Sequence, residues 1–78
     1  MEFKQLQYFL SAAEYLNFTE AAQACFIVQS AMSQQISSLE KELGVTLFVR
    51  EKRVLRLTAE GETLVLEARK ILNQVNNS

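Results

Sequence analysis

The sequence predicts a mainly α-helical fold of three helices, a two-stranded hairpin and a longer final helix. Three segments carry apolar residues at helical spacing, and a later run of β-branched and apolar residues, interrupted by charged ones, is typical of a hairpin. Proline is absent and only two glycines occur in the 78 residues, so we expect the chain to break at Gly44 and Gly61. A chain of this length forms one small domain.

The composition indicates a folded protein of a reducing compartment. Hydrophobic residues make up 49% of the chain, which suffices for a folded core. The single cysteine, Cys25, excludes an internal disulfide and favours a reducing, cytoplasmic setting. The first residues lack the pattern of a signal peptide, and no apolar run is long enough to span a membrane, so we expect a soluble protein.

The first helix is expected over residues 3–16, because apolar residues recur there in steps of three and four. They are Phe3, Leu6, Phe9, Leu10, Ala13 and Leu16. The pair Asn17-Phe18 breaks the pattern, and Thr19 is expected to cap a short second helix over about residues 19–26. The connection to the next helix is brief, so the second and third helices should meet at a steep angle.

The third helix is expected over about residues 30–43 and should end at Gly44, because glycine suits a left-handed cap. One side carries a narrow apolar line that should face the core. That line consists of Met32, Ile36, Leu39 and Leu43. The opposite side is polar and consists of Ser30, Gln34, Ser37 and Lys41, flanked by Ser33 and Ser38.

Two short extended runs, residues 46–50 and 54–57, are expected to pair as a hairpin joined by residues 51–53. This connection, Glu51-Lys52-Arg53, lacks the glycine or asparagine that is usual in such turns. Thr58 should then cap the last helix, which is expected over about residues 59–76.

The last helix carries apolar residues in alternating steps of four and three, which is the spacing of a coiled-coil seam. They are Leu64, Ala68, Ile71 and Val75, and Leu72 widens the stripe. The stripe packs either on the domain's own core or on a second subunit. We expect the second subunit, because a hairpin is too short to cover the stripe. No stop signal precedes the end of the chain, so we expect a fragment cut within or just after this helix.

Few residues could support enzyme chemistry. The sequence contains neither histidine nor aspartate, which removes the commonest general base and most metal-binding and triad arrangements. Cys25 has no cationic neighbour in sequence, so a buried packing thiol is favoured over a nucleophile. A glycine-rich phosphate loop is also absent. We therefore expect neither a catalytic site nor a metal site.

Charge is unevenly distributed, although the formal net charge is only −1. Residues 50–56 contain four basic residues and one acid, a local excess of +3, whereas residues 21–39 contain no charge at all. Such segregation is typical of a small basic contact zone on an otherwise acidic body. Taken alone, the basic run fits an ordinary solvated hairpin equally well.

The polar side of the third helix is unusual, because exposed helix faces are commonly rich in glutamate, lysine and arginine. Serine and glutamine offer uncharged donors and acceptors, which suit base edges in the major groove of DNA. A helix buried against another protein would also tolerate such a face. The order of two helices joined by a tight turn, followed by a basic hairpin, favours DNA, because it is the order of a winged helix-turn-helix.

A series of short motifs runs through the chain in a fixed order. They are Phe9, Ala13-Glu14, Asn17-Phe18-Thr19, Ala21-Ala22, Gln29-Ser30-Ala31-Met32-Ser33-Gln34-Gln35-Ile36, Leu39-Glu40, Leu43-Gly44-Val45, Leu47-Phe48, Arg50, Arg53, Leu57-Thr58 and Glu60-Gly61. Each piece alone is weak evidence, but together they resemble the amino-terminal DNA-binding domain of LysR-type transcriptional regulators, over essentially the whole chain.

The resemblance implies a role for each surface. Bases or nearby phosphates should be approached by Gln29, Ser30, Ser33 and Gln34, and we expect Ser37, on the same polar side of the helix, to join them. The DNA backbone should be contacted by Thr19 and by the wing residues Arg50, Lys52 and Arg53. The last helix should form a homodimer interface through Leu64, Ala68, Ile71, Leu72 and Val75, and the dimer should bind an inverted repeat in a promoter. The resemblance implies no cofactor in this segment and assigns a small-molecule effector to a carboxy-terminal domain that nothing in this chain matches.

Two positions depart from the family pattern. Val28 stands where the family often has a capping serine, which puts the start of the third helix in question. Gln34 stands where a basic residue is common, which puts the base or phosphate contact at that position in question.

The leading hypothesis is sequence-specific binding of double-stranded DNA by a homodimer that regulates transcription in the bacterial cytoplasm. Residues 1–58 are expected to form the winged helix-turn-helix domain, with the helix-turn-helix at about 18–37 and the wing at about 46–57. Residues 59–78 are expected to form a linker and dimerisation helix. The alternative is a helical protein-interaction module that uses the last helix and does not bind DNA.

Overall fold

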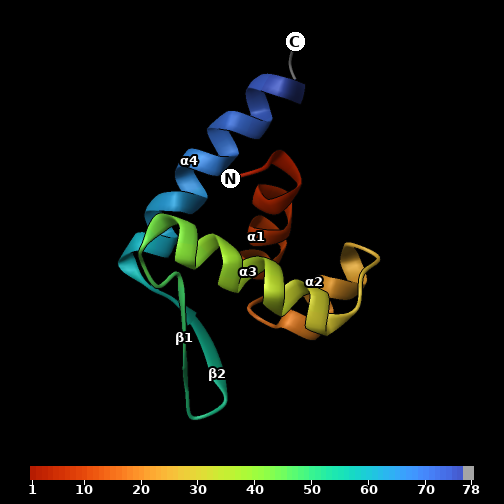
Figure 1. The fold of residues 1–78 in the computed structure, drawn as a ribbon, viewed down its shortest axis with the longest axis vertical. Coiled ribbons are helices and arrows are strands. Elements are labelled where there is room, and N and C mark those ends of the chain that lie inside the picture. Colours follow the sequence, from red (N-terminus) through yellow and green to blue (C-terminus); the bar gives the residue numbers. More distant parts are fainter. Residues whose placement is uncertain (77–78) are drawn as a thin grey trace.

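The computed structural model describes the backbone of residues 1–76 and the side chains of residues 1–73. The elements in chain order are α1 (Phe3–Tyr15), α2 (Phe18–Ala24), α3 (Gln29–Leu43), β1 (Phe48–Glu51), β2 (Val54–Leu57) and α4 (Ala59–Asn76). Helices α1, α2 and α3 pack together, the hairpin projects from one side, and α4 lies beside α1 and extends toward the opposite end (Figure 1). The predicted fold class, mainly helical with a two-stranded wing and a long last helix, is confirmed.

The core lies where the first three helices meet the base of the hairpin. Its largest fully buried side chains are Phe9, Met32, Leu39 and Leu47. The ring of Phe48, at the start of β1, lies 5.6 Å from that of Phe9 and meets the ring of Phe18 edge-on at 5.5 Å, measured between centroids. These aromatic contacts join the base of the hairpin to α1 and α2.

Helix α2 begins one residue earlier than predicted, and Asn17 caps it rather than Thr19. The backbone of Asn17 is extended, with φ −160° and ψ 112°, and its side-chain oxygen accepts a hydrogen bond from the N–H of Glu20 at 3.0 Å. This is the geometry of the residue that precedes the first helical turn, whereas Thr19 is already inside the helix. The prediction that Thr19 caps α2 is therefore wrong.

Helix α3 has the predicted two-sided pattern over most of its length. Met32, Ile36 and Leu39 are buried, but Leu43 is 38% exposed, so the prediction that Leu43 continues the core line is wrong. The chain reverses directly after Leu43, where Gly44 adopts the predicted left-handed cap with φ 71°. Leu43 is therefore at the rim, where it lines a surface hollow with residues of the following loop and of α4.

The hairpin is antiparallel, with Phe48 opposite Leu57 and Glu51 opposite Val54. Only two residues, Lys52 and Arg53, lie between the strands, rather than the predicted three, and both have positive φ angles, 47° and 69°. Two successive left-handed residues are what a two-residue hairpin turn of the favoured twist requires. This chain adopts that turn without glycine or asparagine, at a steric cost to both side chains.

Helix α4 begins at the predicted cap, Thr58, whose hydroxyl oxygen accepts a hydrogen bond from the N–H of Gly61 at 3.0 Å. The expectation that Gly61 breaks the chain is wrong, because this glycine lies buried inside α4. A Cβ atom at Gly61 would collide with the backbone carbonyl oxygen of Leu47 and lie 2.8 Å from Leu57. The absence of a side chain therefore lets α4 approach the base of the hairpin.

The apolar stripe of α4 is largely used within the chain. Ala68 is fully buried, and Leu64 is half-buried against the core. The prediction that a second subunit covers Ala68 is therefore wrong, because this residue is already buried within the chain, where α1 packs on α4. Coverage of the accessible part of Leu64 by a second subunit stays a prediction. Ile71 is 41% exposed and Leu72 is half-buried, whereas Val75 lies outside the described side chains. Among helices within residues 1–76, none combines the length and apolar character needed to cross a membrane.

Candidate nucleic-acid interface

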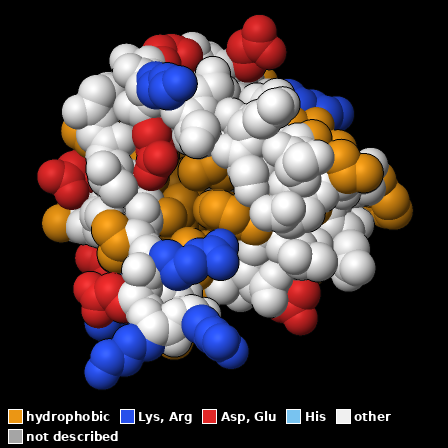
Figure 2. Space-filling view, turned by 60° about the horizontal axis from the view of Figure 1, so that its bottom comes forward, with side chains coloured by type: hydrophobic (Ala, Val, Ile, Leu, Met, Phe, Trp, Pro, Cys, Tyr) orange, Lys and Arg blue, Asp and Glu red, His pale blue; other side chains and the backbone are white. Residues whose placement is uncertain are grey.

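The polar side of α3 is exposed at the end of the molecule from which the hairpin projects. Four of the five residues predicted to contact bases are exposed, and the fifth is half-buried. The exposed ones are Gln29, Ser30, Gln34 and Ser37, and the half-buried one is Ser33. In Figure 2, lysine and arginine side chains lie beside a hollow with a hydrophobic floor, and a largely uncharged surface lies on its other side.

One surface hollow brings together the predicted contacts from three elements. It has a volume of about 230 Å³ and is lined by Leu16, Asn17, Phe18, Thr19, Gln29, Arg50, Arg53 and Leu55. Thr19 comes from the start of α2, Gln29 from the start of α3, and the arginines from the hairpin. The hollow therefore brings together predicted contacts that are distant in sequence, such as Thr19 and Arg53, which are 34 positions apart.

A second hollow lies between α3 and the hairpin, with a volume of about 200 Å³. Ser33, Ser37, Glu40 and Arg50 contribute its polar lining, and apolar residues such as Ile36 and Phe48 line the rest. Arg50 lines both hollows, so it connects the polar side of α3 to the surface at the start of α2.

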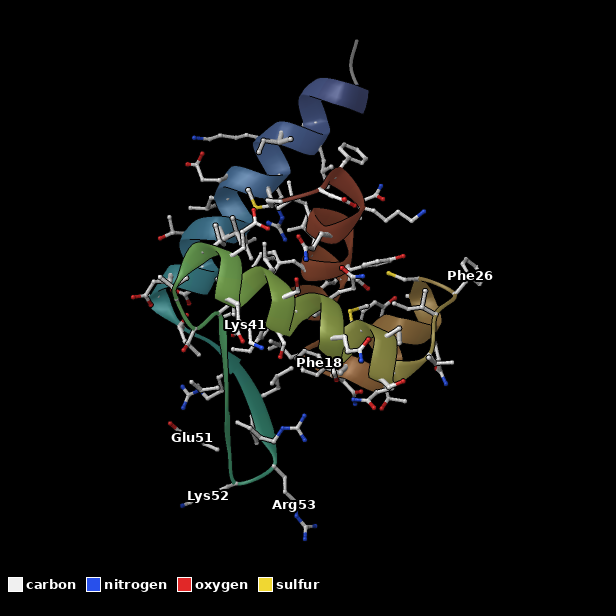
Figure 3. The ribbon with its side chains drawn as sticks, viewed as in Figure 1. Phe18, Phe26, Lys41, Glu51, Lys52 and Arg53 are labelled. Carbon is white, nitrogen blue, oxygen red and sulfur yellow. The ribbon has the colours of Figure 1, made fainter. Side chains whose placement is uncertain are left out.

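The cationic side chains of the hairpin are available to a ligand. Arg50, Lys52 and Arg53 are exposed, and among the described residues they form no ion pair, whereas Arg56 lies 3.8 Å from the carboxylate of Glu51. Lys52 and Arg53 extend from the tip of the hairpin, away from the helices (Figure 3). An unpaired, solvated cation gains more from a phosphate than one that must first leave a carboxylate.

A side-chain hydrogen bond links two of the proposed base-contacting residues near the start of α3. The side-chain amide of Gln29 donates a hydrogen bond to the hydroxyl of Ser33 at 2.8 Å. This bond fixes the Gln29 rotamer and leaves its amide oxygen and second N–H, together with the Ser33 hydroxyl proton, for other partners. A base edge that offers a donor and an acceptor matches this pair of groups.

Two residues that shape this surface were not among the predicted site residues. Glu40, on α3, accepts hydrogen bonds from the N–H groups of Leu47 at 2.7 Å and Phe48 at 3.2 Å, and thereby ties the start of the hairpin to the helix. Lys41 is exposed at the far end of the polar side of α3 and points from the helix toward the base of the hairpin (Figure 3). Lys41 was visible in the helical spacing, but no sequence signal identified the partners of Glu40.

The described residues hold no group of three or more cysteine and acidic side chains placed to bind a metal ion. Cys25 is half-buried rather than fully buried, and it packs against the core.

The polar side of α3, the start of α2 and the cationic hairpin thus form one surface. The whole chain is similar to known proteins. The family described as "Bacterial regulatory helix-turn-helix protein, lysR family" matches residues 3–62. This chain belongs to the LysR family. The family is one of regulatory proteins rather than enzymes.

Named relatives are similar over almost the whole chain. The Hca operon transcriptional activator HcaR of Escherichia coli strain K12 is 45% identical over 78 residues, which are 100% of this chain and 26% of that protein. The HTH-type transcriptional regulator AlsR of Bacillus subtilis strain 168 is 47% identical over 75 residues, 96% of this chain and 25% of that protein. The LysR-family chain therefore spans about a quarter of the length of these relatives.

Solved structures agree with this fold. The DNA-binding domain of CbnR, crystallised with DNA, is 39% identical and superposes with a TM-score of 0.92, covering 99% of this chain and 88% of that one. The corresponding domain of BenM, crystallised with catB site 1 DNA, is 39% identical with a TM-score of 0.94, covering 99% and 86%. The LysR-family fold of this chain is thus that of domains solved on DNA.

Proposed function

We propose that this chain binds double-stranded DNA in a sequence-specific manner and, as a homodimer on an inverted repeat, regulates transcription from a promoter. The observation that carries the proposal is the shared surface of α3 and the hairpin, on which Gln29 lies with Arg50 and Arg53 around one hollow. In a winged helix-turn-helix, this arrangement places α3 in the major groove and the wing on the adjacent backbone. The similarity to CbnR and BenM, each crystallised with DNA, supports it.

The two kinds of residue divide the work of binding. The proposed base contacts are Gln29, Ser30, Ser33, Gln34 and Ser37. The proposed backbone contacts are Thr19, Arg50, Lys52 and Arg53. Phosphate contacts supply affinity and register without reading sequence, whereas uncharged donors and acceptors in the major groove supply the choice of sequence.

Other parts of the proposal concern the assembled regulator in the bacterial cytoplasm. We place dimerisation on the exposed part of α4, where Ile71 and Leu72 remain accessible, and no cofactor takes part in the binding step. Small-molecule sensing belongs, in this proposal, to a carboxy-terminal domain, in keeping with the much greater length of HcaR and AlsR.

Selection of bound sites from random duplexes tests the proposal. We expect a site with two-fold symmetry, and an affinity that falls with salt by about 0.9 logarithmic units per neutralised phosphate for each tenfold rise in salt concentration. A chain that served only as a protein-interaction module would select no sequence and show no affinity linked to salt. That result would overturn the proposed function.

A further inference from the structure

An apolar side chain lies at the start of the polar side of α3. Val28 directly precedes Gln29, the first residue of α3, and 68% of its surface is exposed. Gln29 in turn lines the hollow that Thr19 and Arg50 share. Val28 is therefore an exposed neighbour of a residue on the proposed DNA-binding surface, and it is not part of the core.

Folding does not explain a valine at this position. Val28 is the N-cap residue of α3, with φ −79° and ψ 156°, and it makes no side-chain hydrogen bond to the helix. Serine, threonine, asparagine and aspartate are favoured at N-caps because a side-chain oxygen can accept from the first free N–H groups, which a valine side chain is unable to do. Val28 thus contributes neither a cap nor core packing.

We propose that Val28 contacts the 5-methyl group of a thymine in the major groove and is thereby a specificity-determining residue. The inference rests on the proposed function, because it requires the start of α3 to enter that groove. Thymine is the base that presents a methyl group there, and an apolar side chain recognises it by excluding water from both groups. Gln29 and Ser33, one turn apart beside Val28, bring the hydrogen-bonding groups that read neighbouring base edges.

A cycle of substitutions in protein and DNA tests this contact. The 78-residue chain is titrated with its selected duplex and with duplexes in which each thymine of both half-sites is replaced in turn by uracil, which lacks only the methyl group. We expect replacement of one thymine to weaken binding about fourfold per half-site, the effect of one buried methyl group. With Val28→Ala, the difference in affinity between the two duplexes should become smaller, because the shorter side chain makes less contact with the methyl group.

Phe26→Ala is the matched control. Phe26 is an exposed apolar residue of the same α2–α3 turn, 95% accessible, but Figure 3 shows it at the outer edge of the turn, pointing away from the hairpin. This variant should keep the full discrimination between thymine and uracil. If it loses discrimination as Val28→Ala does, the effect is one of turn structure and the proposal is overturned.

Val28→Ser separates recognition from stability. Serine supplies the missing cap, so the melting temperature should rise while the preference for thymine over uracil disappears. If Val28 had a purely structural role, Val28→Ser would lower the melting temperature and the preference for thymine together. That result would overturn the proposal.

The remaining outcomes distinguish the two levels of inference. If the chain selects no sequence, both the proposed function and the Val28 contact fail. If it selects a symmetric site, but every thymine tolerates uracil, or Val28→Ala retains the full discrimination, the Val28 contact alone fails.

Discussion

Gln29 and Ser33 act as a joined pair, because the amide of one donates to the hydroxyl of the other at 2.8 Å. Substituting either changes the hydrogen-bonding partners of both. Their effects on DNA binding are therefore expected to be non-additive.

Ser33→Ala is expected to relax the preference at one base position by about 1–3 kcal/mol and to leave other positions nearly unchanged. Competition binding with single-base variants of the selected duplex measures this. Ser38→Ala, the same change at another exposed serine of α3, is the control and should preserve the preference. An unaltered preference in Ser33→Ala would contradict the assignment of Ser33 to base contacts.

Arg53→Ala is expected to weaken binding to all sequences by a similar factor and to reduce the salt slope by about 0.9, the value for one phosphate. Affinity at several salt concentrations, for specific and nonspecific duplexes, measures both effects. Arg56→Ala removes a charge that is paired with Glu51 and should change the slope less. A shift in sequence preference caused by Arg53→Ala would show that the division between base and backbone contacts is wrong.

For single residues, the exposure of the candidate site was largely predictable from the sequence, but the residue that caps α2 was not. Asn17 and Thr19 are both residue types that cap helices. The distinction between them depends on which backbone is extended, and that is decided by how the end of α1 leads into α2, where Leu16 adopts a left-handed conformation with φ 49°. A local pattern does not contain that information.

At the scale of the element, the hydrogen bonds of Glu40 hold the hairpin in place relative to α3. Glu40→Ala leaves the N–H groups of Leu47 and Phe48 without their acceptor, and we expect it to lower the free energy of unfolding by about 1–3 kcal/mol. Urea denaturation measures this loss.

Glu40→Gln is the matched variant, because it keeps a side-chain oxygen that can accept. It should retain most of the stability and most of the DNA affinity. If the alanine and glutamine variants are equally unstable, the carboxylate does not act through these two hydrogen bonds.

The hairpin illustrates what a sequence pattern does and does not predict for an element. The β-branched and apolar content of residues 54–57 sufficed to place β2, whereas the turn carries none of the residues that usually mark one. Lys52 and Arg53 occupy left-handed positions that local preference disfavours. The pairing of Phe48 with Leu57, at the base of the hairpin, settles the register from the opposite end.

At the scale of the whole molecule, the long last helix was predictable, but its surroundings were not. The seam spacing was read correctly as one apolar stripe, yet the stripe divides between two uses. Ala68 is buried within the chain, whereas Ile71 is 41% exposed. Which part would be covered depends on α1, more than 50 residues earlier in sequence, and no local pattern reports that packing.

Ile71→Lys is expected to weaken the dimer by placing a charge on the exposed part of the stripe, and to reduce DNA affinity because two half-sites are no longer bound together. Sedimentation velocity measures the association. Asn73→Lys adds the same charge at another exposed position of α4 and should leave the association intact. A wild-type chain that stays monomeric at high concentration would exclude α4 as a dimer interface.

The tight packing at Gly61 links two distant parts of the molecule. No side chain separates this turn of α4 from the carbonyl group of Leu47, and Thr58 donates its N–H to the same carbonyl at 2.9 Å, so the start of α4 lies directly against the base of the wing. Any side chain added at position 61, even the methyl group of alanine, would therefore force α4 and the base of the cationic hairpin apart.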